Sequence, residues 1–171
     1  RVNRLARWPD LINRSIPGGA KHMVPPRNTR DVHGCLARTL PHLSFTAEEE
    51  RMGREGLRSM GIPEDAPFVG FHARDSAWLE NLGPGLDFRY HIHRDSKIND
   101  YIPAMEMLVE KGYYAVRMGS VVKDVLEPSN EKIIDYATNG FRTDFLDIYL
   151  GAKCRFFIGS AAGITELPKI F

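Results

Sequence analysis

The chain has 171 residues, of which 43% are hydrophobic and 26% are charged, and its formal net charge is +1. This composition is typical of a folded globular protein, and the balanced charge gives no reason to expect a nucleic-acid partner. The two cysteines, Cys35 and Cys154, are too far apart in the sequence for a zinc motif or a disulfide framework, which favours a reducing, cytoplasmic location.

Residues 1–45 form a basic leading segment that we expect to be mostly irregular. They carry eight Lys or Arg against two Asp, a net charge of +6, which leaves −5 for the remaining residues. Pro9 and the Pro-Gly-Gly cluster at 17–19 interrupt the helical periodicity, although the pattern allows a short helix around Leu11. We favour a solvated linker. The alternatives are contact with a membrane surface, with an acidic partner or with a missing N-terminal domain of a longer protein.

From residue 46 onward, helices alternate with short apolar strands. Thr46 and Glu49 have capping-box spacing and predict the start of a helix. Asp100 is expected to cap a second helix at residues 101–111. Strands are predicted at residues 68–73, 113–118, 133–137 and 154–158, with a further extended segment at 88–93. This order predicts an α/β fold, a Rossmann-like parallel sheet flanked by helices, in residues 46–171.

The stretch at residues 141–165, FRTDFLDIYLGAKCRFFIGSAAGIT, predicts a helix, a strand and a second helix. The first helix is expected to stop at Gly151, and residues 154–158 have the apolar character of a buried central strand. The loop that follows, GSAAG, has only small residues, which would let a ligand approach the backbone. A helix that begins near Ala161 would direct free N–H groups toward an anion. The stretch therefore has the general geometry of a phosphate-binding loop. The alternative is an ordinary strand-to-helix turn packed with small residues.

Polar residues follow the expected strands at the edge where parallel sheets bind their ligands. His72 and Arg74 are two residues apart, so they share one side of an extended chain and could hold a pyrophosphate together. Asp75 could orient Arg74 or act as a base, and Arg117 could reach the same crevice from the next strand. The alternative for these residues is an ordinary ion pair on the surface or with a helix.

A second polar string, HIHRDS, begins at His91. His91 and His93 could bind a metal ion, but no third ligand has convincing spacing, so no metal is expected. Arg94 is a candidate for substrate binding, and Asp95 is a candidate for the catalytic base.

Four strings taken together resemble a known family. They are FHARDS, the run RYHIHRDSKINDY, EKGYYAVRMG and RTDFLDIYLGAKCRFFIGSAAG. These strings resemble a bacterial family of proteins assigned as glycosyltransferases and found with surface-polysaccharide genes. That family is similar to the fucosyltransferase-type enzymes of the GT-B fold, which use GDP-fucose. The resemblance covers approximately residues 41–171, and the combination of strings is more specific than any one of them.

The resemblance implies a role for particular residues. In the fucosyltransferase-type enzymes an HxR motif after a strand binds the donor diphosphate, and His72 and Arg74 match it, although Asp75 stands where those enzymes carry a second basic residue. In those enzymes an acidic residue lies in the helix before the last motif, and a serine-containing loop after the following strand completes the nucleotide pocket. Asp144 is the closer match to that residue and Asp147 is the alternative. The serine-containing loop of the family is matched by Ser160, Ala161, Ala162 and Gly163.

We therefore expect the donor-binding half of a GT-B-like glycosyltransferase. It would move a sugar from a nucleotide-diphosphate sugar, GDP-linked by the resemblance, to a hydroxyl of a glycan or lipid-linked acceptor. Arg74 would neutralise the leaving diphosphate, so no metal or other cofactor is expected, and Asp75 and Asp95 are candidates for the base. The rivals are a non-catalytic nucleotide- or glycan-binding module and a metal-dependent hydrolase that uses His72, His91 and His93. The expected location is cytoplasmic, with residues 1–45 as a candidate for peripheral contact at the inner face of the membrane.

Overall fold

The computed structural model describes residues 2–22, 38–41, 43–81, 93–128 and 130–171. The chain divides into two compact units, Arg1–Leu40 and Pro41–Phe171. Most of the expected strand at 88–93 lies outside the described residues. No helix among the described residues is long and apolar enough to cross a membrane.

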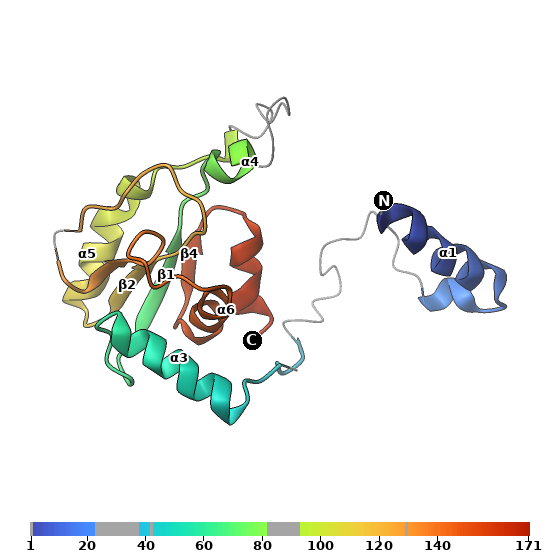
Figure 1. Ribbon diagram of the computed structural model, residues 1–171, viewed down its shortest axis with the longest axis horizontal. Helices are drawn as coiled ribbons and strands as arrows, with labels where there is room; N and C mark the ends of the chain where they lie inside the picture. The colour runs from blue at the N-terminus through green and yellow to red at the C-terminus, as the bar shows by residue number, and fades with distance from the viewer. Residues whose placement is uncertain (1, 23–37, 42, 82–92, 129) are drawn as a thin grey trace. The chain divides into compact units, whose positions relative to one another are not determined.

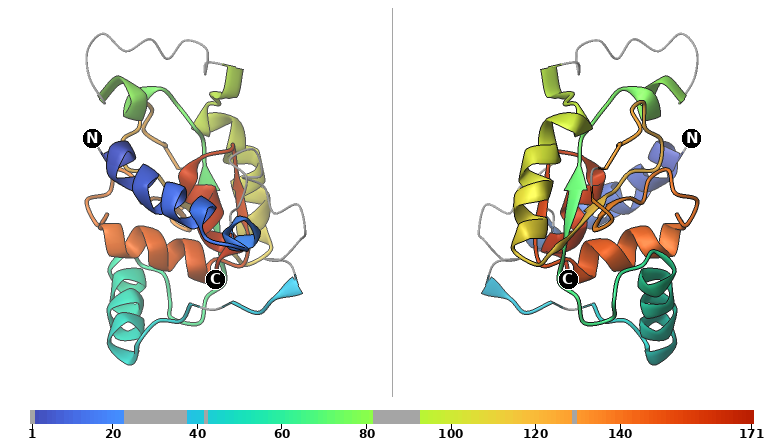
Figure 2. Two further views of the ribbon diagram at one scale, coloured as in Figure 1. Left: turned by 90° about the vertical axis from the view of Figure 1, so that its right-hand side faces the viewer. Right: turned by 90° about the vertical axis from the view of Figure 1, so that its left-hand side faces the viewer.

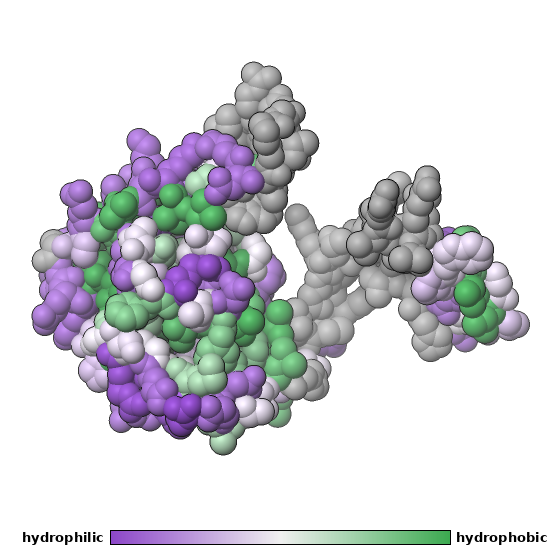
Figure 3. Space-filling model, viewed as in Figure 1, coloured by the Kyte–Doolittle hydropathy of each residue, from purple (hydrophilic) through white to green (hydrophobic). Residues whose placement is uncertain are grey.

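The first unit contains more helix than expected. Helix α1 (Val2–Ser15) runs through Pro9, and a short 3-10 helix, η1 (Gly19–His22), follows it. Helix α1 includes the short helix that the sequence allows around Leu11 and is longer than expected, because the internal proline removes a single backbone hydrogen bond without ending the helix. Trp8, Leu11 and Ile12 are exposed, and hydrophobic side chains gather on the surface of this unit (Figure 3).

The second unit is built on a four-stranded, all-parallel sheet flanked by helices, which confirms the expected fold class (Figure 1). Its strands are β1 (Phe68–His72), β2 (Tyr114–Arg117), β3 (Ile133–Asp135) and β4 (Phe157–Gly159), in the order β3-β2-β1-β4. In the register, Phe68 lies opposite Tyr114 and Gly70 lies opposite Phe157. All four strands therefore end at the same edge of the sheet.

The last strand differs from its prediction. It begins at Phe157 instead of residue 154, and it lies at one edge of the described sheet instead of in its centre. Its residues are at most half-buried, and Phe156 just before it is 41% exposed. An apolar run with two aromatic residues is compatible with either position, because composition reports burial and does not report strand order.

Helices cover both faces of the sheet (Figure 2). On one face, α3 (Ala47–Ser59) and α6 (Asp144–Lys153) pack over Val116, Met118 and Ile134. On the other face, α5 (Ile102–Glu110) packs over Val69, Phe71 and Ala115. This alternation follows from the two-residue period of strands, which sends successive side chains to opposite faces.

Three of the sequence predictions concern helix ends, and the structure confirms one of them and corrects two. The capping box of Thr46 and Glu49 is present at the start of α3, as predicted. Asp100 does not cap α5, because it lies within a 3-10 helix, η3 (Ile98–Tyr101), that runs directly into α5. Gly151 does not end α6, which continues to Lys153. A Cβ atom at Gly151 would lie 2.9 Å from the Cβ of Leu167, so glycine here permits close packing instead of a turn.

Two further short helices lie beside the edge where the strands end. Helix α4 (Ala77–Asn81) follows β1, and the 3-10 helix η4 (Gly163–Lys169) follows β4. The second helix therefore begins two residues later than the predicted start near Ala161. Three small residues, 160–162, thus separate the last strand from the helix.

Candidate functional site

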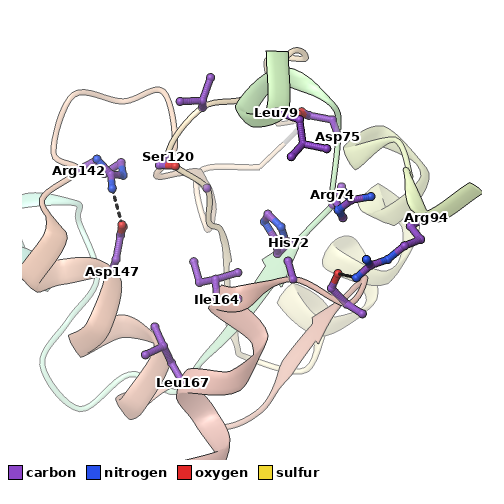
Figure 4. A pocket seen from close by; sticks show the side chains of 16 residues that line it. His72, Arg74, Asp75, Leu79, Arg94, Ser120, Arg142, Asp147, Ile164 and Leu167 are labelled. Atoms are coloured by element: carbon purple, nitrogen blue, oxygen red, sulfur yellow. Dashed lines mark hydrogen bonds and ion pairs between the residues drawn. The ribbon is translucent and has the colours of Figure 1, made fainter. Parts of the chain in front are cut away.

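A pocket of about 570 Å³ lies at the carboxyl edge of the parallel sheet. It is lined by the segment after β1, by the turn after β2, by the loop after β4 and by residues at the start of α6 (Figure 4). The charged side chains that line it are Arg74, Asp75, Arg94, Arg142 and Asp147. This is the position at which open parallel sheets bind their ligands.

His72 ends β1 and projects into the middle of the pocket (Figure 4). Its Nδ1 atom lies 3.1 Å from the carbonyl oxygen of Met118 at the end of the neighbouring strand. A carbonyl oxygen has no proton, so Nδ1 must carry the hydrogen of this bond. Burial lowers the pKa of His72, and the nearby guanidinium groups of Arg117 and Arg74 act in the same direction. The imidazole is therefore neutral near neutral pH.

Arg74 is fixed to the rest of the site by both its backbone and its side chain. Its Nη1 atom donates to Asp95 Oδ1 at 3.0 Å, and only 13% of its side chain is exposed. Its backbone N–H donates to Ser160 Oγ at 2.7 Å, while its carbonyl oxygen accepts from Ser96 N at 2.8 Å. The segment after β1 is thus held between the loop after β4 and the residues 95–96.

The loop after β4 packs closely against β1. The Ser160 N–H donates to the carbonyl oxygen of His72 at 3.2 Å, and Arg94 Nη2 donates to the carbonyl oxygen of Ala161 at 2.8 Å. At Gly159, a Cβ atom would lie 2.6 Å from the His72 carbonyl oxygen, so no other residue fits without movement. At Gly163, by contrast, a Cβ atom would meet nothing within 4 Å. Ala161, Ala162 and Gly163 line the pocket.

Arg142 and Asp147 form a second polar group of the pocket, on the side of α6 (Figure 4). Arg142 Nη2 donates to Asp147 Oδ2 at 2.7 Å. Arg142 Nε and Asp147 Oδ1 are buried and have no hydrogen-bond partner among the described residues. The Tyr136 hydroxyl is close by, but it gives its single proton to the carbonyl oxygen of Thr143 at 3.1 Å. Burial raises the pKa of Asp147, against the opposing effect of the Arg142 guanidinium.

Asp75 lines the pocket, but its carboxylate is bound to two backbone N–H groups and connects two segments of the chain. Its Oδ1 accepts from the backbone N–H of Ala77 at 2.9 Å, and its Oδ2 accepts from the backbone N–H of Lys123, also at 2.9 Å. The carboxylate thereby joins the start of α4 to the turn after β2. The Lys123 ammonium pairs with Glu80 at 2.7 Å and strengthens the same connection.

The structure does not bring every predicted site residue to the pocket. Arg117 is 1% exposed, pairs with Asp135 at 2.8 Å and does not line the pocket, because the buried guanidinium satisfies a carboxylate of the adjacent strand. The Asp144 side chain is 96% exposed and does not line the pocket, although it pairs with Arg142 at 3.0 Å, whereas Asp147, the alternative, lines it. Asp95 and Ser160 lie behind the lining, where each holds Arg74.

The residues proposed for a metal ion are described only in part. His91 lies outside the described residues, and His93 is exposed in a short turn. Within the described ranges no group of three or more His, Cys, Asp or Glu side chains is placed to hold a metal ion. His72 uses one ring nitrogen for Met118, which leaves only Nε2 for another partner.

Sequence reasoning missed Arg142. The signal was present, because Arg142 directly precedes Thr143, whose hydroxyl accepts from Leu146 N at 3.0 Å and caps α6. An arginine just before a capped helix, with an aspartate one turn into that helix, indicates an ion pair across the first turn. What the sequence does not indicate is that this pair faces the segment after β1.

Comparisons with protein-family models, with curated proteins and with solved structures found nothing that matches this chain. The function must therefore be argued from the pocket and from the resemblance of the four sequence strings.

Proposed function

We propose that residues 41–171 form the donor-binding part of a GT-B-like glycosyltransferase that binds a nucleotide-diphosphate sugar. The observation that carries this proposal is the lining of one pocket by three arginine side chains, Arg74, Arg94 and Arg142, together with the backbone of residues 161–163. Guanidinium groups match the geometry of phosphate oxygens, and small residues let phosphate reach the backbone amides. A pocket of about 570 Å³ is of the size that binds small molecules.

The proposed chemistry is transfer of the sugar to a hydroxyl of a glycan or lipid-linked acceptor. Arg74 neutralises the diphosphate as the sugar leaves, since positive charge fixed beside developing negative charge lowers the barrier. Arginines can supply this charge without a metal ion, so we propose a metal-independent reaction. Asp147 takes the place of the family's acidic residue, because it lines the pocket and Asp144 does not.

We further propose that the acceptor is bound with an N-terminal domain of the parent protein, in the cytoplasm at the inner face of the membrane. The basic residues of the segment 1–45 and the exposed Trp8, Leu11 and Ile12 of α1 support such a peripheral contact. Basic and aromatic residues on one helix favour an anionic membrane surface.

A non-catalytic nucleotide-binding module is the second candidate. This candidate is favoured because the two carboxylates that the sequence offers as bases, Asp75 and Asp95, already have hydrogen-bond partners within the protein. Asp75 accepts two backbone hydrogen bonds, and Asp95 is paired with Arg74. Both carboxylates therefore already have partners within the protein, which supports binding without proton transfer. The two candidates share the nucleotide site and differ in whether the sugar is transferred.

The experiment that tests the nucleotide site is a thermal-shift screen of GDP, UDP, ADP and their sugar derivatives. A ligand that binds the folded state raises the melting temperature with concentration. Gly163→Val places bulk in the pocket where the structure leaves open space, so it should abolish the shift without unfolding the protein. Ala47→Val, at the exposed start of α3, creates the same side chain elsewhere and should leave the shift intact.

The proposal fails if none of these compounds stabilises the protein, or if Gly163→Val binds as well as the wild type. Release of the sugar to an acceptor, measured as free nucleoside diphosphate, then separates an enzyme from a binding module.

A further inference from the structure

His72 occupies the middle of the pocket, yet its contacts do not suit the phosphate-binding role that its sequence motif suggests. A histidine that binds phosphate uses ring N–H groups or a positive charge. The only N–H group that the neutral ring has is already given to the Met118 carbonyl oxygen at 3.1 Å. The ring therefore has no further proton to offer a phosphate oxygen.

The other ring nitrogen, Nε2, is an acceptor in this tautomer. Among the residues that the structure describes, none makes a hydrogen bond to Nε2. Nε2 is also absent from the described side-chain atoms that are buried without a partner, so this atom is exposed. It is thus reachable from the pocket that His72 lines (Figure 4). An acceptor at this position is suited to a hydroxyl group of a ligand.

We propose that His72 is a neutral hydrogen-bond acceptor whose Nε2 atom binds a hydroxyl group of the sugar in a nucleotide-sugar ligand, and that charge neutralisation of the diphosphate is left to the arginines. The choice of a nucleotide sugar rests on the proposed function, whereas the tautomer does not.

The surroundings of the ring keep it neutral. Burial disfavours the imidazolium ion, and the guanidinium groups of Arg117 and Arg74 repel it. The Asp75 carboxylate favours the charged form, but its two oxygens are already bound to the backbone N–H groups of Ala77 and Lys123. The pKa of His72 consequently lies below its ordinary value. Nucleotide affinity should therefore show no increase from His72 as the pH falls from about 8 to about 7.

The first test is the tautomer itself, measured on the free protein by long-range ¹H–¹⁵N NMR of histidine near pH 7. The resonances of His72 are identified by their loss in His72→Asn. The expected spectrum has a protonated Nδ1 and an unprotonated Nε2. A protonated Nε2, alone or together with Nδ1, would overturn the proposal. This result does not depend on whether the protein is a glycosyltransferase.

The second test compares the affinity for GDP with that for GDP-fucose. Asn at position 72 can retain the donor to the Met118 carbonyl oxygen but has no group at the position of Nε2. His72→Asn should leave GDP affinity within about threefold and reduce the preference for GDP-fucose over GDP by about two- to tenfold, the loss of one neutral hydrogen bond. His72→Gln, which places an amide oxygen near the Nε2 position, should restore part of the preference.

The outcomes separate this proposal from the proposed function. A loss of GDP affinity of tenfold or more in His72→Asn would show that His72 binds the diphosphate and would overturn the proposal. If neither compound binds the wild type, the GDP-linked donor is wrong, and the NMR measurement alone decides the state of His72.

Discussion

Replacement of Arg74 is the most direct perturbation of the proposed diphosphate site. Its guanidinium lines the pocket and makes a 3.0 Å hydrogen bond with Asp95, which orients it. A charged hydrogen bond to phosphate contributes about 1.5–3 kcal/mol. Arg74→Ala should therefore weaken GDP binding by about ten- to hundredfold. Arg74→Lys should recover only part of the affinity, because a point charge cannot reproduce the planar fork of donors.

The same change should affect stability only modestly. The backbone N–H of Arg74, which binds Ser160, is unchanged by truncation of the side chain. The Asp95 side chain is 25% exposed, so water can solvate the carboxylate that loses its partner. We expect a decrease in the free energy of unfolding of about 1 kcal/mol, as for partly exposed ion pairs. Urea denaturation measures this decrease in the free energy of unfolding, and isothermal titration calorimetry measures the affinity for GDP.

Arg58→Ala is the matched control. The Arg58 side chain is 54% exposed on α3, where it reaches Glu64 at 3.5 Å, and it does not line the pocket. Arg58→Ala removes the same charge from the protein without altering the pocket. Unchanged GDP affinity in a folded Arg74→Ala protein would refute the assignment. An equal loss in Arg58→Ala would show that the net charge of the domain, instead of a specific contact, attracts the nucleotide.

Two further predictions concern the elements around the pocket. The pKa of Asp147 is raised above its ordinary value of 3.8 by burial, so the folded state binds a proton more tightly than the unfolded state. Asp147 thus lowers stability as the pH rises above the unfolded pKa and through the folded pKa, and Asp147→Asn should remove this contribution, so that its unfolding free energy relative to the wild type increases as the pH is raised above 3.8. A pH dependence identical to that of the wild type in urea denaturation would contradict this. Gly159→Ala should destabilise the protein by about 1–3 kcal/mol, because the added Cβ would lie 2.6 Å from the His72 carbonyl oxygen. Gly163→Ala, with no atom within 4 Å of its Cβ, should change stability by less than about 0.5 kcal/mol, and equal effects of the two alanines would be inconsistent with the close approach of β4 to β1.

The parallel sheet and its helices could be predicted because each rests on a local signal. The strands are short apolar runs separated by helices, and a chain with that order has few other ways to bury both kinds of element. The capping box at Thr46 is likewise a contact between residues three positions apart. The location of a pocket at the carboxyl edge follows from parallel strand direction alone, without knowledge of strand order.

The features that sequence reasoning missed depend on contacts between distant segments. Gly151 has the pattern of a helix stop, but its role is set by Leu167, sixteen positions away. Arg117 ends β2 and Arg74 lies just after β1, yet Arg117 meets Asp135 of the adjacent strand and is buried. Only the strand order and the course of the chain between strands decide which arginine faces a pocket and which faces a carboxylate. The sequence does not specify that arrangement locally.

Ser160 illustrates how such a contact changes the meaning of a mutation. The resemblance places Ser160 among the residues expected to bind the substrate. In the structure, however, Ser160 Oγ accepts from the Arg74 N–H at 2.7 Å and lies 3.4 Å from Ser96 Oγ, while the pocket lining begins at Ala161. We infer that the hydroxyl holds the loop after β4 against the segment after β1, so that both present their atoms to one ligand.

Ser160→Ala should therefore lower stability and affinity together. The partly buried N–H of Arg74 would lose its acceptor, which costs about 1–3 kcal/mol, and the loop that carries residues 161–163 would lose its anchor. Ser59→Ala removes a hydroxyl that donates to the Glu55 carbonyl oxygen on the exposed side of α3, and it should change neither quantity by much. Urea denaturation and GDP titration of both variants distinguish the two roles of Ser160. A loss of GDP affinity with unchanged stability would mean that the hydroxyl binds phosphate directly and that the anchoring role is wrong.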